Sequence, residues 1–519
     1  MYLEEYKYKA KKKIFEYDIS RGLESANNTY GRCVISMNNI SPKAYPCISP
    51  RSPYYIWDVS HSVKSIGSID GKIYYTQGTS FYYDGKIIGE VSSEEKNFLN
   101  FGQTVLIFPD NKCFDTKTGE LTSLVSSVKV KVTFINSDLG VHAIKSDNSA
   151  INLATTFYAG QGILISGSGN DMIDGYHYIR AVDRNGGVLY FSNYEFGSAD
   201  IPSYSCTISN EIPPMDSVCL CQNRVWGVKG RNVYASKVGD PKSFCAYNMN
   251  EQCSYKAEYF DTDGFTHIAE YGGSPVIFSD SAVYKVYGNN ADNYELDIIC
   301  RGGGILLDDV FSMAEMDGEL YYMSHGVPMR FTGAKAVAVQ NFPYKNLRKA
   351  CGAARKGNYY ISCTDENREN KFLVYNTDTG FWYEQNDLWI SKMITYNNAL
   401  YGISTIGAYL LDYEGDVSGD GEYEGRVESQ FELDDVFSFG QTLCPERIIV
   451  RANVYIGGEL NVEILYDREL LWHSVGGRSG DGDGIVEIAL PKRKCNSFKL
   501  KFKCKGDYCI KNIAVECCV

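Results

Sequence analysis

Short apolar runs, separated by turn residues, recur along most of the chain. In each repeat a turn of Gly, Asp, Asn or Gln precedes a short strand rich in aromatic and β-branched residues, and a second turn and strand follow. Aromatic and β-branched residues favour strands, while Gly, Asn and Asp favour tight turns. Each repeat therefore predicts a β-hairpin.

Seven hairpins are predicted in this way. Their strand pairs fall at residues 72–75 and 80–83, 104–108 and 112–115, 224–227 and 232–235, 275–278 and 282–287, 319–322 and 327–331, 358–361 and 371–375, and 399–403 and 408–412. From the third hairpin on, the leading turns are about 40–50 residues apart, the length of one four-stranded propeller blade. The pattern predicts an all-β fold with a β-propeller of about seven blades. A string of hairpins in sandwiches is the alternative.

Two regions depart from the repeat. Residues 126–212 interrupt it between the second and third hairpins, and strand patterns at 128–135, 162–166 and 188–191 predict an inserted small β-barrel or sandwich. Residues 414–519 begin with a Gly-rich acidic stretch, and strand patterns follow at 447–451, 460–466, 485–490 and 498–505. Strict alternation in the last of these predicts one apolar and one solvated face, as in a β-sandwich, here expected to be jelly-roll-like.

These boundaries give five predicted segments. They are an N-terminal arm and propeller-closing segment (1–60), the first blades (61–125), the insert (126–212), the remaining blades (213–413) and the C-terminal sandwich (414–519). Residues 45–65 are expected to close the propeller by pairing with the last blade.

Composition narrows the functional classes. The net charge of −13 over 519 residues argues against a nucleic-acid coat, because such proteins neutralise phosphates with Lys and Arg. No apolar run reaches the roughly 20 residues of a membrane helix, so no membrane anchor is expected. The 17 cysteines are odd in number and irregular in spacing. Without a secretory signal they indicate reduced thiols in a protein folded in a cytosol.

The sequence offers little sign of catalysis. Six histidines are scattered singly, and no nucleophile, phosphate-binding or zinc-protease motif occurs. We therefore predict no catalytic residue, no cofactor-binding residue, no metal ligand and no cofactor. Two acidic Gly-rich stretches, 416–424 and 480–484, lack the ligand spacing of an EF-hand, so a turn is favoured over a calcium site. A glycosidase needs only two carboxylates and stays open as a minor alternative.

One basic cluster is a candidate contact patch. It comprises Lys492, Arg493, Lys494, Lys499, Lys501, Lys503 and Lys505. Its functional interpretation is docking on an acidic neighbouring subunit or on nucleic acid. The alternative is a solubilising strand face that protects a sheet edge from aggregation. A second basic tract at Lys7, Lys9 and Lys11–Lys13 has the same two interpretations.

Four ordered segments resemble structural proteins of tailed bacteriophages and prophages of Firmicutes. They are NRVWG (223–227) with VYASKVGDP (233–241), residues 275–278 with 283–288, residues 373–377 with 380–383, and residues 490–495 with 505–507. The resemblance covers roughly residues 100–519. This family is similar, more distantly, to the propeller-bearing tail nozzle and packaged-DNA stabilisation proteins of short-tailed phages, which form rings below the portal and close or extend the DNA channel.

The resemblance implies a non-enzymatic virion protein without a cofactor, assembled in the bacterial cytoplasm and placed in the tail or at the head–tail junction. It implies as partners further copies of the chain in a ring, other tail or connector proteins, and packaged DNA in transient contact. Two alternatives stay open. One is a tail-tip or receptor-binding protein that grips a host surface glycan through the insert or the sandwich, and the other is the glycosidase.

Overall fold

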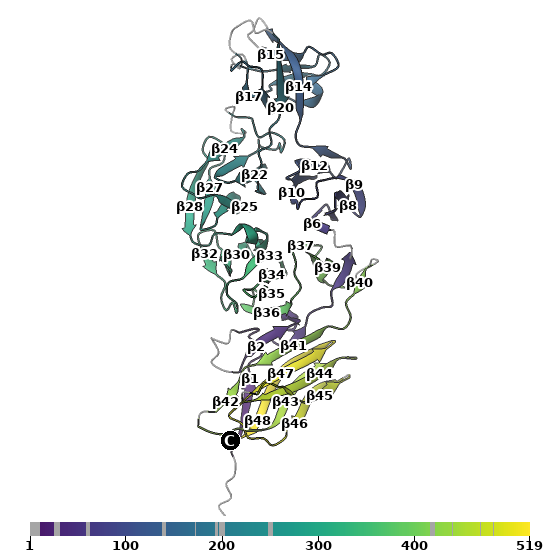
Figure 1. Cartoon of the computed structure of the whole chain (residues 1–519), viewed down its shortest axis with the longest axis vertical. Coiled ribbons are helices and arrows are strands. Elements are labelled where there is room, and N and C mark those ends of the chain that lie inside the picture. The colour runs from purple at the N-terminus through teal and green to yellow at the C-terminus, as the bar shows by residue number, and fades with distance from the viewer. Residues whose placement is uncertain are drawn as a thin grey trace, which may run out of the picture. The chain divides into compact units, whose positions relative to one another are not determined.

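The computed structural model describes residues 11–24, 32–58, 63–136, 142–171, 173–192, 196, 203–247, 253–415, 421–438, 440–467, 469–480 and 482–519. The described chain is nearly all β and divides into two compact units. The internal unit comprises Ser62–Val310 and Thr332–Ala336, and the terminal unit comprises Met1–His61, Phe311–Phe331 and Val337–Val519. Figure 1 labels the strands of both units.

The internal unit contains four antiparallel four-stranded sheets. In chain order they are β6 (Val63–Ile69), β7 (Lys72–Gln77), β8 (Ser80–Tyr83) and β9 (Lys86–Glu90); β10 (Asn97–Phe101), β11 (Thr104–Phe108), β12 (Lys112–Asp115) and β13 (Leu121–Ser123); β21 (Ser217–Cys221), β22 (Arg224–Lys229), β23 (Asn232–Ala235) and β24 (Tyr255–Glu258); and β25 (Phe265–Tyr271), β26 (Ser274–Ser279), β27 (Ala282–Tyr287) and β28 (Glu295–Arg301).

Three further sheets follow along the chain. They are β29 (Ala314–Met316), β30 (Glu319–Ser324), β31 (Val327–Phe331) and β32 (Ala336–Ala338); β33 (Arg348–Arg355), β34 (Asn358–Thr364), β35 (Asn370–Asn376) and β36 (Phe381–Asn386); and β37 (Lys392–Tyr396), β38 (Ala399–Ser404) and β39 (Gly407–Asp412), completed by β5 (Tyr55–Asp58) and β40 (Glu422–Tyr423). Because β5 pairs with β39, an N-terminal segment supplies the fourth strand of the last sheet, as expected for a closing strand.

The leading turns of the seven sheets explain why the hairpins are visible in the sequence. In six of them both turn residues have positive φ: Asp70–Gly71, Gln222–Asn223, Gly272–Gly273, Asp317–Gly318, Lys356–Gly357 and Asn397–Asn398. Positive φ at both positions defines the type I′ hairpin turn, which suits Gly, Asn and Asp. The seven predicted hairpins are the second and third strands of the seven sheets, so the all-β, propeller-like fold class is confirmed.

The insert forms one antiparallel sheet of seven strands in the order β17-β16-β20-β14-β15-β19-β18. The strands are β14 (Ser127–Asn136), β15 (His142–Ser146), β16 (Gly162–Ser166), β17 (Gly175–Tyr178), β18 (Ala181–Asp183), β19 (Val188–Tyr190) and β20 (Tyr204–Ser209), with the short helix α1 (Leu153–Thr156). The sheet and α1 share a hydrophobic core of their own, which includes Val132, Leu153, Ile165 and Ile208.

The C-terminal region forms the predicted sandwich of two antiparallel sheets. One has the order β1-β48-β43-β46, with β1 (Lys12–Tyr17), β48 (Tyr508–Cys518), β43 (Cys444–Val454) and β46 (Gly482–Ala489). The other has the order β2-β41-β47-β44-β45, with β2 (Val34–Asn38), β41 (Glu428–Leu433), β47 (Ser497–Lys505), β44 (Glu459–Tyr466) and β45 (His473–Ser479), and β42 (Val436–Phe437) also pairs with β47. Apolar residues of both sheets belong to one core.

The first sixty residues differ from the predicted arm and closing segment. Only β5 has the closing role, whereas β1 and β2 belong to the sandwich, as the purple strands among the green and yellow ones show (Figure 1). The segment between them holds β3 (Ile40–Ser41), β4 (Ser49–Pro50) and the 3-10 turn η1 (Pro42–Ala44), while a second 3-10 turn, η2, spans Leu307–Ser312. The partners of β1 and β2 are hundreds of residues away, so local pattern does not reveal the pairing.

Candidate functional site

The lysine stripe predicted as a contact patch lies on β47, between β41 and β44. Each of its four lysines faces a carboxylate on a neighbouring segment. The pairs are Lys499 with Asp435 at 3.8 Å, Lys501 with Glu432 at 2.7 Å, Lys503 with Glu463 at 2.8 Å and Lys505 with Glu428 at 2.7 Å. The stripe is therefore neutralised across the strands, and because β47 is an interior strand these lysines protect no edge.

The other three basic residues lie apart from the stripe, in the connection from β46 to β47. Arg493 forms an ion pair with Glu469, and its guanidinium lies 4.5 Å from the centroid of the Tyr466 ring. Lys492 and Lys494 are exposed, and neither has an ion-pair partner among the described residues. Arg493 thereby joins this connection to the turn between β44 and β45.

That turn carries two exposed leucines. Leu470 is 95% and Leu471 is 76% exposed, which is unusual for adjacent apolar residues in a folded domain. We call Leu470, Leu471, Lys492, Arg493 and Lys494 the leucine tip. It combines apolar surface with exposed positive charge, in a chain whose net charge is −13.

A second apolar tip lies at the other end of β44. Ile456 is 85% exposed and Tyr455 is 48% exposed, in the turn between β43 and β44. A hollow of about 620 Å³ lies beside Tyr455 and is also lined by Pro50, Pro53 and Asp507. An eight-residue strand spans roughly 27 Å. The sandwich thus presents two different apolar surfaces at opposite ends of one strand.

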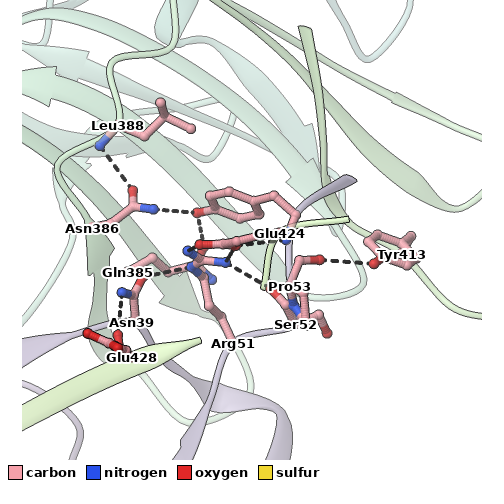
Figure 2. A network of polar contacts seen from close by, with 11 residues as sticks. Asn39, Arg51, Ser52, Pro53, Gln385, Asn386, Leu388, Tyr413, Glu424 and Glu428 are labelled. Atoms are coloured by element: carbon pink, nitrogen blue, oxygen red, sulfur yellow. Dashed lines mark hydrogen bonds and ion pairs between the residues drawn. The ribbon is translucent and has the colours of Figure 1, made fainter. Parts of the chain in front are cut away.

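A buried polar network in the terminal unit is centred on Arg51, which is 4% exposed (Figure 2). Its NH1 and NH2 groups donate to the two carboxylate oxygens of Glu424 at 2.6 and 2.8 Å, and its Nε donates to Asn39 Oδ1 at 2.7 Å. The guanidinium also stacks on the Tyr54 ring, 3.6 Å from the centroid. This bidentate pairing is the geometry in which Arg binds carboxylate most strongly.

Hydrogen bonds extend this network in two directions. Toward the blades, Asn386 Nδ2 donates to the Tyr54 hydroxyl at 3.0 Å. Toward the sandwich, Asn39 Nδ2 donates to the Glu428 carbonyl at 2.7 Å. Figure 2 shows both branches meeting at Arg51. The network therefore fastens the N-terminal segment to the last blades and to β41 within the terminal unit.

The carboxyl group of Glu424 is held ionised. Burial raises its pKa, but the hydrogen bonds and charge of Arg51, with the backbone N–H of Tyr54, lower it more, so its pKa lies below the usual value. Glu424 belongs to one of the two acidic stretches considered for calcium. Residues 416–420 and Asp481 lie outside the described part of the chain, and Asp483 of the other stretch lies 3.5 Å from Lys511.

The motif residues that carry the phage resemblance have structural roles in the sheet β21–β24. Arg224 is fully buried, and its NH1 group donates to the Ser236 carbonyl at 2.8 Å. The Ser236 hydroxyl accepts the backbone N–H of Val225 at 3.0 Å. Trp226 is fully buried in the shared core of this sheet and the next. These contacts account for the NRVWG and VYASKVGDP segments by packing and hydrogen bonding.

The same motif anchors the insert. Asp240 accepts the Tyr158 hydroxyl at 2.8 Å, and Lys237 donates to the Gly160 carbonyl at 2.7 Å. At the base of the insert, the Asn210 N–H donates to the Ser126 carbonyl at 3.0 Å. The two ends of the insert therefore lie side by side on the internal unit.

Other candidate chemistry is sparse. In the described part of the chain no group of three or more His, Cys, Asp and Glu side chains is arranged for metal binding. Lys7 and Lys9 of the N-terminal basic tract lie outside the described residues, and Lys12 pairs with Glu516 at 2.5 Å. All 17 cysteines are free thiols, buried or partly buried. Among the helices that the structure describes, none has the length and apolar character to cross a membrane.

The repeated four-stranded sheets place the chain in the broad class of propeller-like all-β proteins. No protein-family model matches it, and no curated protein matches it in a sequence search. Solved structures similar to it include the endosialidase of phage phi92 (10% identity, TM-score 0.27, covering 86% of this chain and 75% of that one) and BamB from Moraxella catarrhalis (8% identity, TM-score 0.28, 71% and 99%). Sqt1 of Saccharomyces cerevisiae has 10% identity and a TM-score of 0.33, covering 72% and 98%. These values define neither a family nor an activity.

Sequence reasoning missed both apolar tips and the Arg51 network. The leucine tip has a visible signal, because an apolar pair at 470–471 stands in a turn between two strands. Arg51 and Glu424 are separated by 373 residues, so nothing local in the sequence marks them as partners.

Proposed function

We propose that this protein is a non-enzymatic structural component of a bacteriophage tail or head–tail junction that assembles into a closed ring. Its partners are further copies of itself and other tail or connector proteins, and the ring extends or closes the DNA channel and retains the packaged DNA. The resemblance of its motif segments to phage structural proteins supports the virion assignment.

The observation that carries the assembly is the pair of different apolar tips at opposite ends of β44. Cyclic rings form by heterologous contacts, in which one surface of a subunit binds a different surface of the next. The leucine tip offers a protruding apolar surface, and the hollow beside Tyr455 offers a receiving one. The positive charges of Lys492 and Lys494 favour an acidic neighbour, and each further copy of this chain is acidic overall.

Mass photometry of the purified chain, alone and with DNA-filled tailless capsids, tests the proposal. The expected result is one discrete ring mass, either in solution or on capsids that then retain their DNA. The double substitution Leu470→Ser and Leu471→Ser is expected to reduce the ring fraction at least tenfold. The two leucines, exposed in the single chain, would be buried in the contact, so replacing them with serine weakens association at each interface.

Ile87→Ser is the matched control, since Ile87 is 65% exposed on β9 and belongs to neither tip. It should leave the ring intact. A protein that stays monomeric and does not bind capsids would contradict the proposal. That result would favour glycan binding first and glycan hydrolysis second. Loss of the ring in the control as well as in the leucine variant would show that the tips are not the specific contact.

A further inference from the structure

A second hollow in the terminal unit, of about 460 Å³, lies beside the Arg51 network. It is formed by the connection from β36 to β37, the turn from β38 to β39, the first residue of β35 and the N-terminal segment around Tyr54. Its volume falls within the range of ligand pockets, roughly 300–1,000 Å³. We call it the Trp389 hollow.

The lining combines aromatic rings with uncharged and acidic polar groups. Tyr54 and Tyr409 are buried in its floor, while Trp389 is half-buried in its wall. Asp387 is exposed and Asn370 half-buried at its margin. Carbohydrates present flat C–H faces and rings of hydroxyl groups. Aromatic side chains match the faces, and carboxylate and carboxamide groups match the hydroxyls.

The charges of the hollow select against acidic ligands. Among the described residues that line it, Arg51 is the one cation, and its guanidinium nitrogens donate to Glu424 and to Asn39. Asp387 adds a further negative charge. A phosphate or a sugar carboxylate would therefore meet carboxylates without an available cation, whereas an uncharged sugar would meet acceptors for its hydroxyl protons.

The backbone that presents Asp387 and Trp389 is held in place before any ligand arrives. The Leu388 N–H donates to Asn386 Oδ1 at 3.1 Å, and the Ile390 N–H donates to the Ser362 hydroxyl at 2.9 Å. Figure 2 shows the bond between Asn386 and Leu388, and Asn386 Nδ2 also donates to the Tyr54 hydroxyl. Because Asn386, Leu388 and Ile390 are held by these bonds, Asp387 and Trp389 lose less conformational entropy when a ligand binds.

From these observations we infer that the Trp389 hollow binds an uncharged carbohydrate, with a sugar ring against Trp389 and its hydroxyls on Asp387 and Asn370. The ligand-contacting residues Trp389, Asp387 and Asn370 lie in the blades and belong to neither apolar tip, although Arg51 lines both this hollow and the one beside Tyr455. The inference therefore does not depend on ring assembly.

An immobilised panel of neutral and acidic oligosaccharides tests the inference with the full-length chain. The wild type is expected to bind at least one neutral glycan. Trp389→Ala is expected to weaken that binding at least tenfold, and so is Asp387→Asn, which keeps size and hydrogen-bonding capacity but removes the charged acceptor. Asp387 is exposed, so this second variant keeps the fold even if Trp389→Ala loses stability.

Trp472→Ala is the matched control, because Trp472 is half-buried in the sandwich beneath Lys501, away from the hollow. It should bind as the wild type does. Absence of binding to every neutral glycan overturns the inference, as does binding only to acidic glycans, or neutral binding that both hollow variants retain. Mass photometry of the same samples reports assembly separately, so failure at the hollow is distinguishable from failure of the ring.

Discussion

At three places a buried polar side chain joins segments that are distant in sequence. Arg51 connects the N-terminal segment to Glu424. Arg224 on β22 donates to the Ser236 carbonyl, just after β23. Asn210 connects the base of the insert to the Lys242 carbonyl in the blades. Each has several donors in fixed geometry and satisfies carbonyl or carboxylate oxygens that would otherwise be buried without partners. Such groups are expensive to remove, because their partners stay buried.

Removing the Arg51 guanidinium tests this at a single residue. Arg51→Met keeps much of the side-chain volume but leaves the Glu424 carboxylate without its cation and Asn39 Oδ1 without the Arg51 donor. We expect the free energy of unfolding at pH 7 to fall by about 2 kcal/mol. This is less than the full value for a buried ion pair, because 35% of the Glu424 side chain is exposed to solvent. Urea unfolding followed by fluorescence measures the change, and a loss below 0.5 kcal/mol, on the order of a surface pair, would contradict it.

The pH dependence of that stability has a defined sign. The folded pKa of Glu424 is lowered, so its pairing stabilises the protein above the unfolded pKa of about 4.3, and this contribution is lost as the pH falls through the folded pKa. Glu424→Gln should therefore be less stable than the wild type at pH 7, and the two should converge below about pH 4. Parallel stability curves over that range would contradict the assignment.

At the level of elements, the inner strands were predictable and the outer ones were not. The second strand of each sheet follows a turn that contains a positive-φ residue and carries buried apolar residues, as in β26, so both signals appear locally. Fourth strands such as β9 and β13 are short and largely exposed, and their pairing depends on a neighbour that is already in place. Tertiary context, rather than propensity, forms them.

The lysine stripe shows the same limit for a candidate site. Alternation along β47 correctly predicts an outward row of lysines, but the facing acids Glu432 and Glu463 lie on β41 and β44, and pattern within one strand cannot assign them. Cross-strand neighbours decide whether a charged row is free or neutralised. The lining of the Trp389 hollow comes from segments that are far apart in the sequence, so the sequence does not reveal it for the same reason.

A charge-reversal cycle on the stripe tests its neutralisation. Lys503→Glu places a carboxylate beside Glu463, so we expect a loss of about 1 kcal/mol in the free energy of unfolding. Adding Glu463→Lys should restore most of that loss by recreating the pair with opposite polarity. Chemical denaturation at low and high salt measures the coupling, which should shrink with salt. Additive effects of the two substitutions would rule the pair out as a stabilising contact.

On the scale of the whole molecule, the chain combines repeated sheets with an insert that has its own core and a sandwich whose core is continuous with that of the last blades. The insert has its own hydrophobic cluster and returns to the blades beside the point where it leaves them. The sandwich draws its strands from both ends of the chain. The insert should therefore be separable from the rest of the chain, whereas the sandwich should not.

Excising the insert tests this distinction. Replacing residues 127–209 with Gly-Gly joins Ser126 to Asn210, whose backbones already share a hydrogen bond. We expect the remaining chain to fold and to form the same ring as the full-length protein, with a slightly lower melting temperature from the lost Tyr158–Asp240 contact. Circular dichroism and mass photometry report both, and an unfolded or aggregated product would show that the blades need the insert.

The pairing of β1 with β48 has a consequence for biosynthesis. Lys12 leaves the ribosome 504 residues before its partner Glu516, a wait of roughly 25–100 s at bacterial and eukaryotic translation rates. The strands of the internal unit pair with partners that are close in sequence, so this unit can fold while the rest of the chain is being synthesised. A nascent chain that stops early has no β48 and leaves β1 and β43 as bare edges for proteases. Only a copy translated through β48 can complete its sandwich, so truncated chains are excluded from assembly.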